Sequence, residues 1–388
     1  MKKTTIILIS IFICNIIYAQ KTDYITFGTN TTLDVVTWNI ENFPKNGQTT
    51  LDYLTPIIES LEIDIFAFQE ISDPVLFEQM VANIDGYSCY FESSWYAGLA
   101  YLYNYNTIQI NDIYEIYTTE PYWSPFPRSP MVMEFTYDNE DYVLINNHLK
   151  CCGDGTLNLN DADDEENRRY IANNLLQEYI VENFPDEKVF VVGDMNDEIT
   201  DPSEDNVFQN IIDNTENFMF ADMEIANSNS SEWSYPTWPS HLDHILITNE
   251  LFVDFENELS EIQTLKIEES LDGGWSEYDQ NISDHRPVGI KIFSENTLEL
   301  GEFDSNNFVF NSSPNPCKSK LNFEFDEVLE NSVIEIYNIY GKRVQKINIS
   351  KGQSRTVINL NNMPEGIYFA KLITNNNTIN CNTIIIGN

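Results

Sequence analysis

Several apolar runs of strand length in this chain end in a side chain that can bind a metal or move a proton. Their length and their alternating pattern predict strands. The expected strands are 33–38, 63–68, 99–103, 131–137, 142–145, 189–192, 244–248 and 288–293. The polar residues at or near the ends of such runs are Asn39, Glu70, Asp194, Asn196 and Asp284. This pattern indicates a polar centre built from strand ends.

The histidines fall in the same places. All four lie in short clusters with Asp or Asn, in the sequences NNHL, SHLDH and SDHRP. Asp284 and His285 are adjacent, so on an extended segment their side chains point in different directions. One can then bind a metal while the other acts as a base. A buried Asp243 would fix the tautomer of a distant imidazole. Carboxylate and amide oxygens favour Mg²⁺, Mn²⁺ or Ca²⁺ over zinc.

The N-terminus has the pattern of an export signal. Two lysines, an apolar stretch and Ala19 predict a secretory signal peptide over residues 1–19. That stretch is short for a membrane span, and no later run reaches the roughly 18 apolar residues that would suggest one. The mature protein is expected to be exported.

The cysteines leave their pairing open. Without Cys14 five remain, so in an oxidising compartment at least one thiol has no partner within the chain. Cys151 and Cys152 could pair with each other or with Cys89. Cys317 and Cys381 flank the last region and could also pair. No Cys/His zinc spacing is present.

Charge divides the chain into two parts. The formal net charge is −42, yet after residue 300 eight basic residues balance eight acidic ones. A linker at 296–312 leads into short strands and turns over 313–388, which predict a small β-sandwich. An acidic surface repels polyanions. A halotolerant or highly soluble secreted surface explains it better than a role in cation binding.

One helix and one acidic loop stand out before this linker. Residues 164–182 have apolar positions at helical spacing after an acidic first turn. The preceding loop, 151–167, is rich in glycine and acid. It could hold a structural Ca²⁺, but it lacks the ligand order of an EF-hand, and a solvated loop is the simpler interpretation.

The polar clusters resemble the motifs of a known family. They are WNIEN (38–42), FQEI (68–71), GLAYLYN (98–104), PRSPMV (127–132), NNHLK (146–150), GDMND (193–197), LDHIL (242–246) and SDHRPV (283–288). Their order is that of the endonuclease/exonuclease/phosphatase superfamily, which includes deoxyribonuclease I, exonuclease III, neutral sphingomyelinases and inositol polyphosphate phosphatases. The resemblance covers 30–295 and implies an α+β fold, a four-layer αββα sandwich like that of deoxyribonuclease I.

The resemblance also implies a role for each matching residue. It assigns a divalent metal, Mg²⁺ or Mn²⁺, to Asn39, Glu70 and Asp284. It makes His285 the general base that activates water, oriented by Asp243. The residues that would position the nucleophile and the phosphate, or serve the leaving oxygen, are Asp194, Asn196 and His148. Arg128 is a candidate phosphate clamp, and an ordinary surface arginine is the alternative interpretation.

The C-terminal region resembles a second known module. PNP, the stretch YNIYGKRV and MPEGIYFAKL are similar to the sorting domain of the type IX secretion system. This resemblance implies a β-sandwich recognised by the secretion machinery and a secreted or cell-surface location. The ending IIIGN lacks the basic residues common at such termini, so the sequence does not say whether the domain is cleaved.

Together these observations predict a secreted, metal-dependent phosphodiesterase, foremost an extracellular nuclease acting on DNA or RNA. The scarcity of Lys and Arg before residue 300 keeps open a phosphatase or phospholipase C-like hydrolase of a small or lipid phosphoester, such as sphingomyelin or an inositol phosphate. A binding protein without turnover is a third interpretation. It is disfavoured because drifted relatives usually lose a base or a metal carboxylate, and this chain keeps them all. The sequence does not distinguish DNA from RNA as the substrate, or endo from exo action. It also leaves open the number of metals and the oligomeric state.

Overall fold

The computed structural model separates the chain into two compact units that divide after Ser294. It describes residues 25–91, 97–294 and 310–387, apart from 327, 329–331, 340–341, 361–362 and 375–376. The expected signal peptide, 1–19, and most of the expected linker, 296–312, lie outside the described residues. No helix in the described ranges has the length and apolar character needed to span a bilayer.

The first unit contains two six-stranded sheets. One has the order β11-β12-β1-β2-β4-β3, with β1 and β2 parallel and the other neighbours antiparallel. Its strands are β11 (Glu261–Thr264), β12 (Val288–Ile292), β1 (Leu33–Phe43), β2 (Ile65–Ile71), β4 (Gly98–Asn104) and β3 (Tyr87–Phe91). We call this the first sheet.

The second sheet has the order β5-β6-β7-β8-β10-β9, in which only β7 and β8 are parallel neighbours. Its strands are β5 (Ile108–Glu115), β6 (Met131–Tyr137), β7 (Glu140–His148), β8 (Lys188–Asp194), β10 (Asp243–Thr248) and β9 (Phe218–Phe220).

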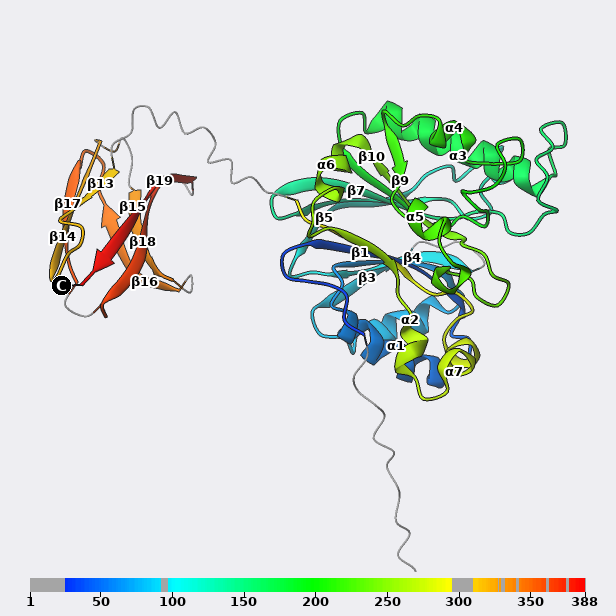
Figure 1. The fold of residues 1–388 in the computed structure, drawn as a ribbon, viewed down its shortest axis with the longest axis horizontal. Coiled ribbons are helices and arrows are strands. Elements are labelled where there is room, and N and C mark those ends of the chain that lie inside the picture. Colours follow the sequence, from blue (N-terminus) through cyan, green and yellow to red (C-terminus); the bar gives the residue numbers. More distant parts are fainter. Residues whose placement is uncertain are drawn as a thin grey trace, which may run out of the picture. The chain divides into compact units, whose positions relative to one another are not determined.

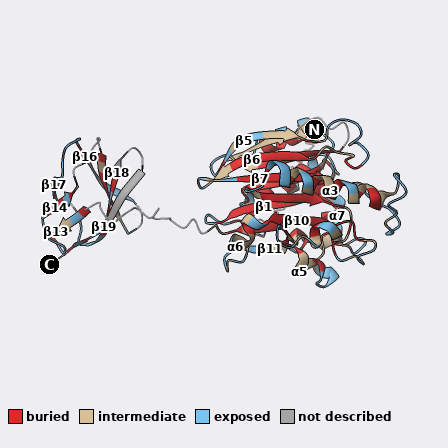
Figure 2. Ribbon diagram, turned by 90° about the horizontal axis from the view of Figure 1, so that it is seen from above, coloured by how far each residue is buried: buried red, intermediate tan, exposed pale blue. Residues whose placement is uncertain are grey.

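Helices cover the outer face of each sheet (Figure 1). The first sheet packs against α1 (Gln48–Leu61), α2 (Pro74–Val81) and α7 (Gly274–Asn281), and the second against α3 (Glu165–Asn183) and α4 (Gln209–Ile212). Three apolar layers result, one between the sheets and one under each helical layer. Figure 2 shows the buried residues concentrated on the strands. The expected four-layer αββα sandwich is confirmed.

Strand alternation decides which side chains enter each layer. In β1, Val36 and Trp38 pack toward the helices, whereas Leu33 and Val35 pack between the sheets. Successive side chains of a strand point to opposite faces, so the residues that continue the Leu33 and Val35 series also face the second sheet. Asn39 is one of them.

A buried polar bridge joins the two sheets beneath these strand ends. Gln69 Nε2 donates to Thr37 Oγ1 at 3.1 Å and to Asn146 Oδ1 at 2.8 Å. Asn146 Nδ2 donates to the carbonyl of Phe68 at 3.0 Å, and the Asn146 backbone NH donates to Tyr101 Oη at 3.0 Å. Buried hydrogen bonds weaken steeply when their geometry departs from the ideal. This set of bonds therefore fixes the register of one sheet on the other.

The second unit contains only strands among its described residues. One sheet has the order β13-β14-β17 and the other β16-β15-β18-β19, and they enclose one apolar core. Its strands are β13 (Phe310–Ser313), β14 (Lys320–Phe325), β15 (Ser332–Asn338), β16 (Arg343–Ile349), β17 (Arg355–Asn359), β18 (Gly366–Thr374) and β19 (Asn377–Ile386). The expected all-β region after the αββα sandwich is confirmed.

Candidate active site

One end of the inter-sheet layer carries the site. In β8, Phe190 and Val192 pack between the sheets, so Asp194 continues that face into the opening at its end. The strand register aligns Asp194 with His148 of β7 on one side and with Asp243 of β10 on the other. Three predicted site residues therefore form a row across the second sheet, opposite Asn39 of the first.

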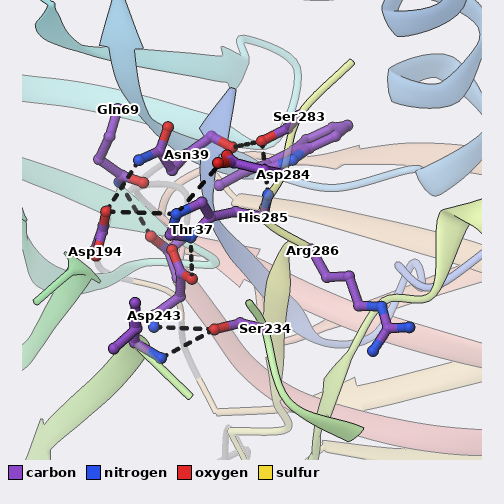
Figure 3. Close-up of polar contacts among 12 residues, drawn as sticks. Thr37, Asn39, Gln69, Asp194, Ser234, Asp243, Ser283, Asp284, His285 and Arg286 are labelled. Carbon is purple, nitrogen blue, oxygen red and sulfur yellow. Dashed lines mark hydrogen bonds and ion pairs between the residues drawn. The ribbon is translucent and has the colours of Figure 1, made fainter. Parts of the chain in front are cut away.

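His285 and Asp243 form the central pair of the site. His285 Nδ1 donates to Asp243 Oδ2 at 2.7 Å, which leaves Nε2 facing Asp194 Oδ2 at 3.9 Å (Figure 3). The His285 backbone is also held, because its NH donates to Ser283 Oγ at 2.9 Å and its carbonyl accepts from Tyr278 Oη at 2.6 Å. The ring is thus fixed in one orientation with one nitrogen turned to the carboxylates.

Charge around His285 favours its protonated form. Burial alone would lower the pKa of this imidazole, but the carboxylates of Asp243 and Asp194 raise it to about 10. A divalent cation on the surrounding carboxylates would oppose that effect, because its charge has the opposite sign.

Glu70, Asp194 and Asn39 form a cluster of oxygen-bearing side chains. Asn39 Nδ2 donates to Glu70 Oε1 at 3.2 Å and to Asp194 Oδ2 at 3.0 Å. Burial raises the pKa of Asp194 to about 7, to which the neighbouring Asp243 and Glu70 carboxylates add. Glu70 has a φ of 67°, in the left-handed region that non-glycine residues rarely adopt. Such backbone strain persists where surrounding structure enforces it and is concentrated at functional sites.

Asp284 meets the site from the segment that precedes β12. Its backbone NH donates to Glu41 Oε2 at 2.9 Å, and its Oδ1 lies 4.0 Å from His285 Nε2. Burial raises the pKa of Glu41, and Asp284 adds to that effect, although Lys45 opposes it. Glu41 and Asp284 are therefore neighbours, on the side of the site where the pairing of β1 with β2 shifts register.

The structure thus offers a donor set for a divalent cation. Asn39 Nδ2 links an oxygen of Glu70 to one of Asp194, an oxygen of Asp284 lies 4.0 Å from His285 Nε2, and one oxygen of Asp243 is buried without a hydrogen-bond partner among the described residues. The ligand atoms of Asp194, Asp243 and His285 lie within 4.8 Å of one another. Hard oxygen ligands and concentrated negative charge fit Mg²⁺ or Mn²⁺. Neither group of possible metal ligands found in the described residues lies in the acidic loop 151–167.

His148 and Arg128 border the carboxylates. His148 Nε2 lies 3.4 Å from Asp194 Oδ2 and 3.9 Å from Glu70 Oε1. Burial lowers the pKa of His148 well below its usual value, with contributions from Arg128 and His285, so this imidazole is neutral at neutral pH. Arg128 is half-buried and makes no hydrogen bond or ion pair within the described part of the chain. An unpaired guanidinium beside the site is free to bind an anion.

Asn196 holds the loop that follows β8. Its backbone NH donates to Asp194 Oδ1 at 3.1 Å, and its Nδ2 donates to the Leu149 carbonyl at 3.2 Å. Its φ is 55°, again in the left-handed region. The loop after β8 is therefore tied to the loop after β7.

A second histidine cluster lies around the start of β10. Asp222 Oδ2 accepts from His241 Nε2 at 3.0 Å and pairs with His244 Nδ1 at 2.6 Å. His244 Nε2 faces the Asp197 carbonyl at 2.9 Å, and a carbonyl only accepts, so both nitrogens of His244 carry protons. Burial would lower the pKa of His244, but Asp222 raises it above its usual value. These side chains form a closed internal ion pair rather than a second active site.

Two residues of the site region were not singled out by the sequence. Asp222 follows β9 in a turn, and Tyr235 belongs to the segment SYPTW. The Tyr235 ring lies 4.7 Å from the His285 ring between centroids. Trp238, three residues later, is 78% exposed. The closeness of SYPTW to the LDHIL motif was the available signal, but aromatic residues are usually core or rim packing.

Comparison with known proteins identifies the family and the fold of this chain. A family model described as "Endonuclease/Exonuclease/phosphatase family" matches residues 36–285, and one described as "Secretion system C-terminal sorting domain" matches 313–387. Among solved structures, D. rerio TDP2 complexed with single strand DNA product is 13% identical, with 68% of this chain and 99% of that chain covered and a TM-score of 0.52. D. rerio TDP2 humanized by 14 mutations is 14% identical, with the same coverage and a TM-score of 0.50.

At these identities the solved structures show the fold alone. Curated proteins give no match to the chain. The family model spans most of the first unit and contains every predicted site residue. The chain belongs to the endonuclease/exonuclease/phosphatase family, as a hydrolase that ends in a type IX secretion sorting domain.

Proposed function

We propose that this protein is an exported, divalent-metal-dependent phosphodiesterase that hydrolyses nucleic acid. The observation that carries the proposal is the oriented His285–Asp243 pair, whose free imidazole nitrogen faces a group of carboxylates. A base next to a cation-binding group is what metal-assisted attack of water on a phosphodiester requires.

Three side chains would hold the cation: Asn39, Glu70 and Asp284. Their oxygen chemistry suits Mg²⁺ or Mn²⁺. When bound, the cation would supply Lewis-acid polarisation of a phosphoryl oxygen. Asp194, which accepts from the same Asn39 Nδ2 as Glu70, would position the attacking water.

The remaining roles follow from position. His285 Nε2 would take a proton from water, and Asp243 would keep the ring in the tautomer that leaves this nitrogen available. Asn196 would orient the phosphate beside Asp194. Neutral His148 would bind the phosphate or serve the leaving oxygen. Arg128, which has no partner among the described residues, would clamp a phosphate oxygen.

Nucleic acid is favoured as the substrate by the aromatic segment SYPTW, which carries Tyr235 and Trp238. Tyr235 packs on the His285 ring and Trp238 is largely exposed, and aromatic faces stack with bases at about 1–3 kcal/mol per base. The similar fold of TDP2 is seen with a single strand DNA product. The net charge of −42 opposes binding of a polyanion, so the bound cation and Arg128 must supply much of the local attraction.

The same scarcity of basic residues supports a second candidate. A small or lipid phosphoester, such as a sphingomyelin or an inositol phosphate, presents less charge than DNA or RNA and would be repelled less by this surface. In that case the protein would be a phosphatase or a phospholipase C-like hydrolase with the same catalytic residues.

We assign the segments of the chain accordingly. Residues 30–295 would be the catalytic domain, 296–312 a linker and 313–388 the sorting domain. Residues 1–19 would be a signal peptide removed during export. The sorting domain supports secretion or display at the cell surface through the type IX machinery.

The decisive experiment compares substrates. The purified protein would be incubated with Mg²⁺ or Mn²⁺, with and without chelator, on plasmid DNA, RNA and sphingomyelin, with His285→Ala as the control. Chelator-sensitive cleavage of DNA or RNA by the wild type alone supports the proposal. Hydrolysis of sphingomyelin without cleavage of nucleic acid would support the second candidate, and no hydrolysis of any substrate would refute the nuclease.

A further inference from the structure

Two adjacent cysteines lie at the start of the acidic loop, three residues beyond His148. Cys151 and Cys152 are both exposed, and their Sγ atoms are 3.0 Å apart. That separation is within about 1 Å of the S–S bond length of about 2.05 Å. The pair therefore needs little movement to become a disulfide.

The backbone around this pair is fixed from beneath by a buried arginine. Arg169 Nη1 donates to the Lys150 carbonyl at 2.7 Å and to the Cys152 carbonyl at 2.8 Å. Cys152 has a φ of 72°, which a side chain larger than glycine rarely adopts, so the surrounding contacts must hold it there. The two thiols are thus presented together by a supported turn.

The same arginine connects the pair with the site. Arg169 Nε donates to Asp197 Oδ2 at 2.8 Å, and Asp197 follows Asn196 directly. Asn196 in turn donates to the Leu149 carbonyl. A covalent change at the cysteines therefore acts on the loop that follows His148 and on the loop that follows Asp194.

The other described cysteines offer no comparable partner. Cys89 lies on β3, at the edge of the first sheet, and Cys317 is buried in the second unit. The sorting domain takes the chain to an exported location, where disulfides form and persist. The Lys150 ammonium lies 3.8 Å from Cys151 Sγ and places a positive charge beside a sulfur that would attack an oxidant.

We propose that Cys151 and Cys152 are a modification site and form a disulfide between neighbouring residues. The Cys151 thiolate would attack a small-molecule or protein disulfide, releasing one thiolate of the oxidant and forming a mixed disulfide. The Cys152 thiolate would then attack the Cys151 sulfur and release the second thiolate. The two cysteines lose two electrons and two protons, and the oxidant gains them as two thiols.

This disulfide would be labile. Neighbouring Cα atoms are about 3.8 Å apart, below the usual range of about 4.4–6.8 Å for bonded cysteines, and strained disulfides are reduced more easily. Thiols would therefore reduce this bond more easily than an unstrained disulfide between distant segments of the chain.

The test is a labelling experiment on the full chain and is independent of its substrate. The protein is equilibrated with glutathione disulfide, blocked with N-ethylmaleimide, digested and weighed by mass spectrometry, before and after reduction with a phosphine. We expect the peptide with both cysteines to be unlabelled and lighter by two hydrogen atoms, and to gain two labels after reduction. Cys89→Ser is the matched control and should give the same result.

Other results would overturn the proposal. Two labels before reduction would mean that the thiols stay free, and a peptide linked to Cys89 would mean a different partner. Cys152→Ser provides a further check, because Cys151 should then carry glutathione or a label and never an internal bond. A Cys152→Ser protein that still yields the lighter peptide would exclude the assignment.

Discussion

The first unit contains two clusters of the same residue types with opposite properties. His285, Asp243 and Asp194 meet at the open end of the inter-sheet layer. His241, His244 and Asp222 meet in the apolar layer between the second sheet and its helices. In the first cluster His285 Nε2 has no carboxylate closer than 3.9 Å, and an Asp243 oxygen has no partner among the described residues. In the second, both histidines use both ring nitrogens in hydrogen bonds.

The difference lies in what each cluster leaves unsatisfied. Buried polar groups that are fully bonded stabilise one geometry and have nothing left to offer a ligand. The cluster at the strand ends keeps lone pairs and negative charge directed at one region. Residue type alone therefore does not distinguish the two clusters, whereas the hydrogen-bond partners of each atom show which cluster can still bind a ligand.

The strongest test of this contrast is His285→Ala. Removal of a general base lowers turnover by about 10²–10⁴-fold, which corresponds to about 3–5 kcal/mol of transition-state stabilisation. We expect a loss of that size in kcat on the cleaved substrate. The thermal unfolding midpoint should also fall, because the buried Asp243 carboxylate loses its partner, but the circular dichroism spectrum should show an intact fold. An unchanged kcat would remove His285 as the base.

Asp222→Asn should lower the stability of the protein and leave its turnover unchanged. It leaves the buried His244 imidazolium without its counter-ion, and breaking a buried pair in this way costs about 3–5 kcal/mol. We expect the free energy of unfolding, measured with urea, to fall by that amount. Turnover per folded molecule should stay near the wild-type value, and a loss comparable with that of His285→Ala would mean that the closed cluster takes part in catalysis.

Glu70→Gln should reveal a cation requirement. The substitution keeps the shape of the side chain and removes one negative charge from the proposed ligand set. We expect the Mg²⁺ concentration for half-maximal activity to rise by about 10–100-fold, the range seen even for groups that support metal ligands indirectly. Glu261→Gln, which makes the same change at the surface in an ion pair with Lys291, is the matched control. Equal titrations for Glu70→Gln and the wild type would contradict the assignment.

The smallest effect expected is a pH dependence of stability. Asp222 raises the pKa of His244 in the folded state, so this contribution is fully present below the unfolded value of about 6.5 and is lost as pH rises through the folded value. With chelator present, the stability difference between the wild type and Asp222→Asn should therefore shrink as pH rises above about 6.5. A difference that stays constant or grows from pH 6 to 9 would show that His244 is not charged.

The sequence predicted the central strands and α3 because their burial follows a simple period. It did not predict α1, which has no side-chain cap and contains Pro56, a residue that usually signals the end of a helix. It also missed β5, an edge strand whose mostly exposed or half-buried residues obscure the alternation. Edge strands are half-solvated, so their pattern is weak.

The convergence of the predicted site residues could be anticipated because the odd or even position of each residue on its strand sets the face it occupies. Asp194 and His148 continue the inter-sheet series of β8 and β7, and so reach the same opening. Asp222 and Tyr235 come from turns, where no period links a residue to a face. Such contacts depend on long-range packing and become visible only in three dimensions.

The polar bridge of Gln69 and Asn146 has a consequence for the moment at which this protein becomes active. Asn39 and Glu70 come from the first sheet, and His148, Asp194 and Asp243 from the second, so neither half contains a complete set. A chain in which only one sheet has formed cannot assemble base, carboxylates and phosphate-binding groups together. Under the proposed mechanism, hydrolysis would therefore begin only when the two halves dock in register, and a partly folded chain would be catalytically silent.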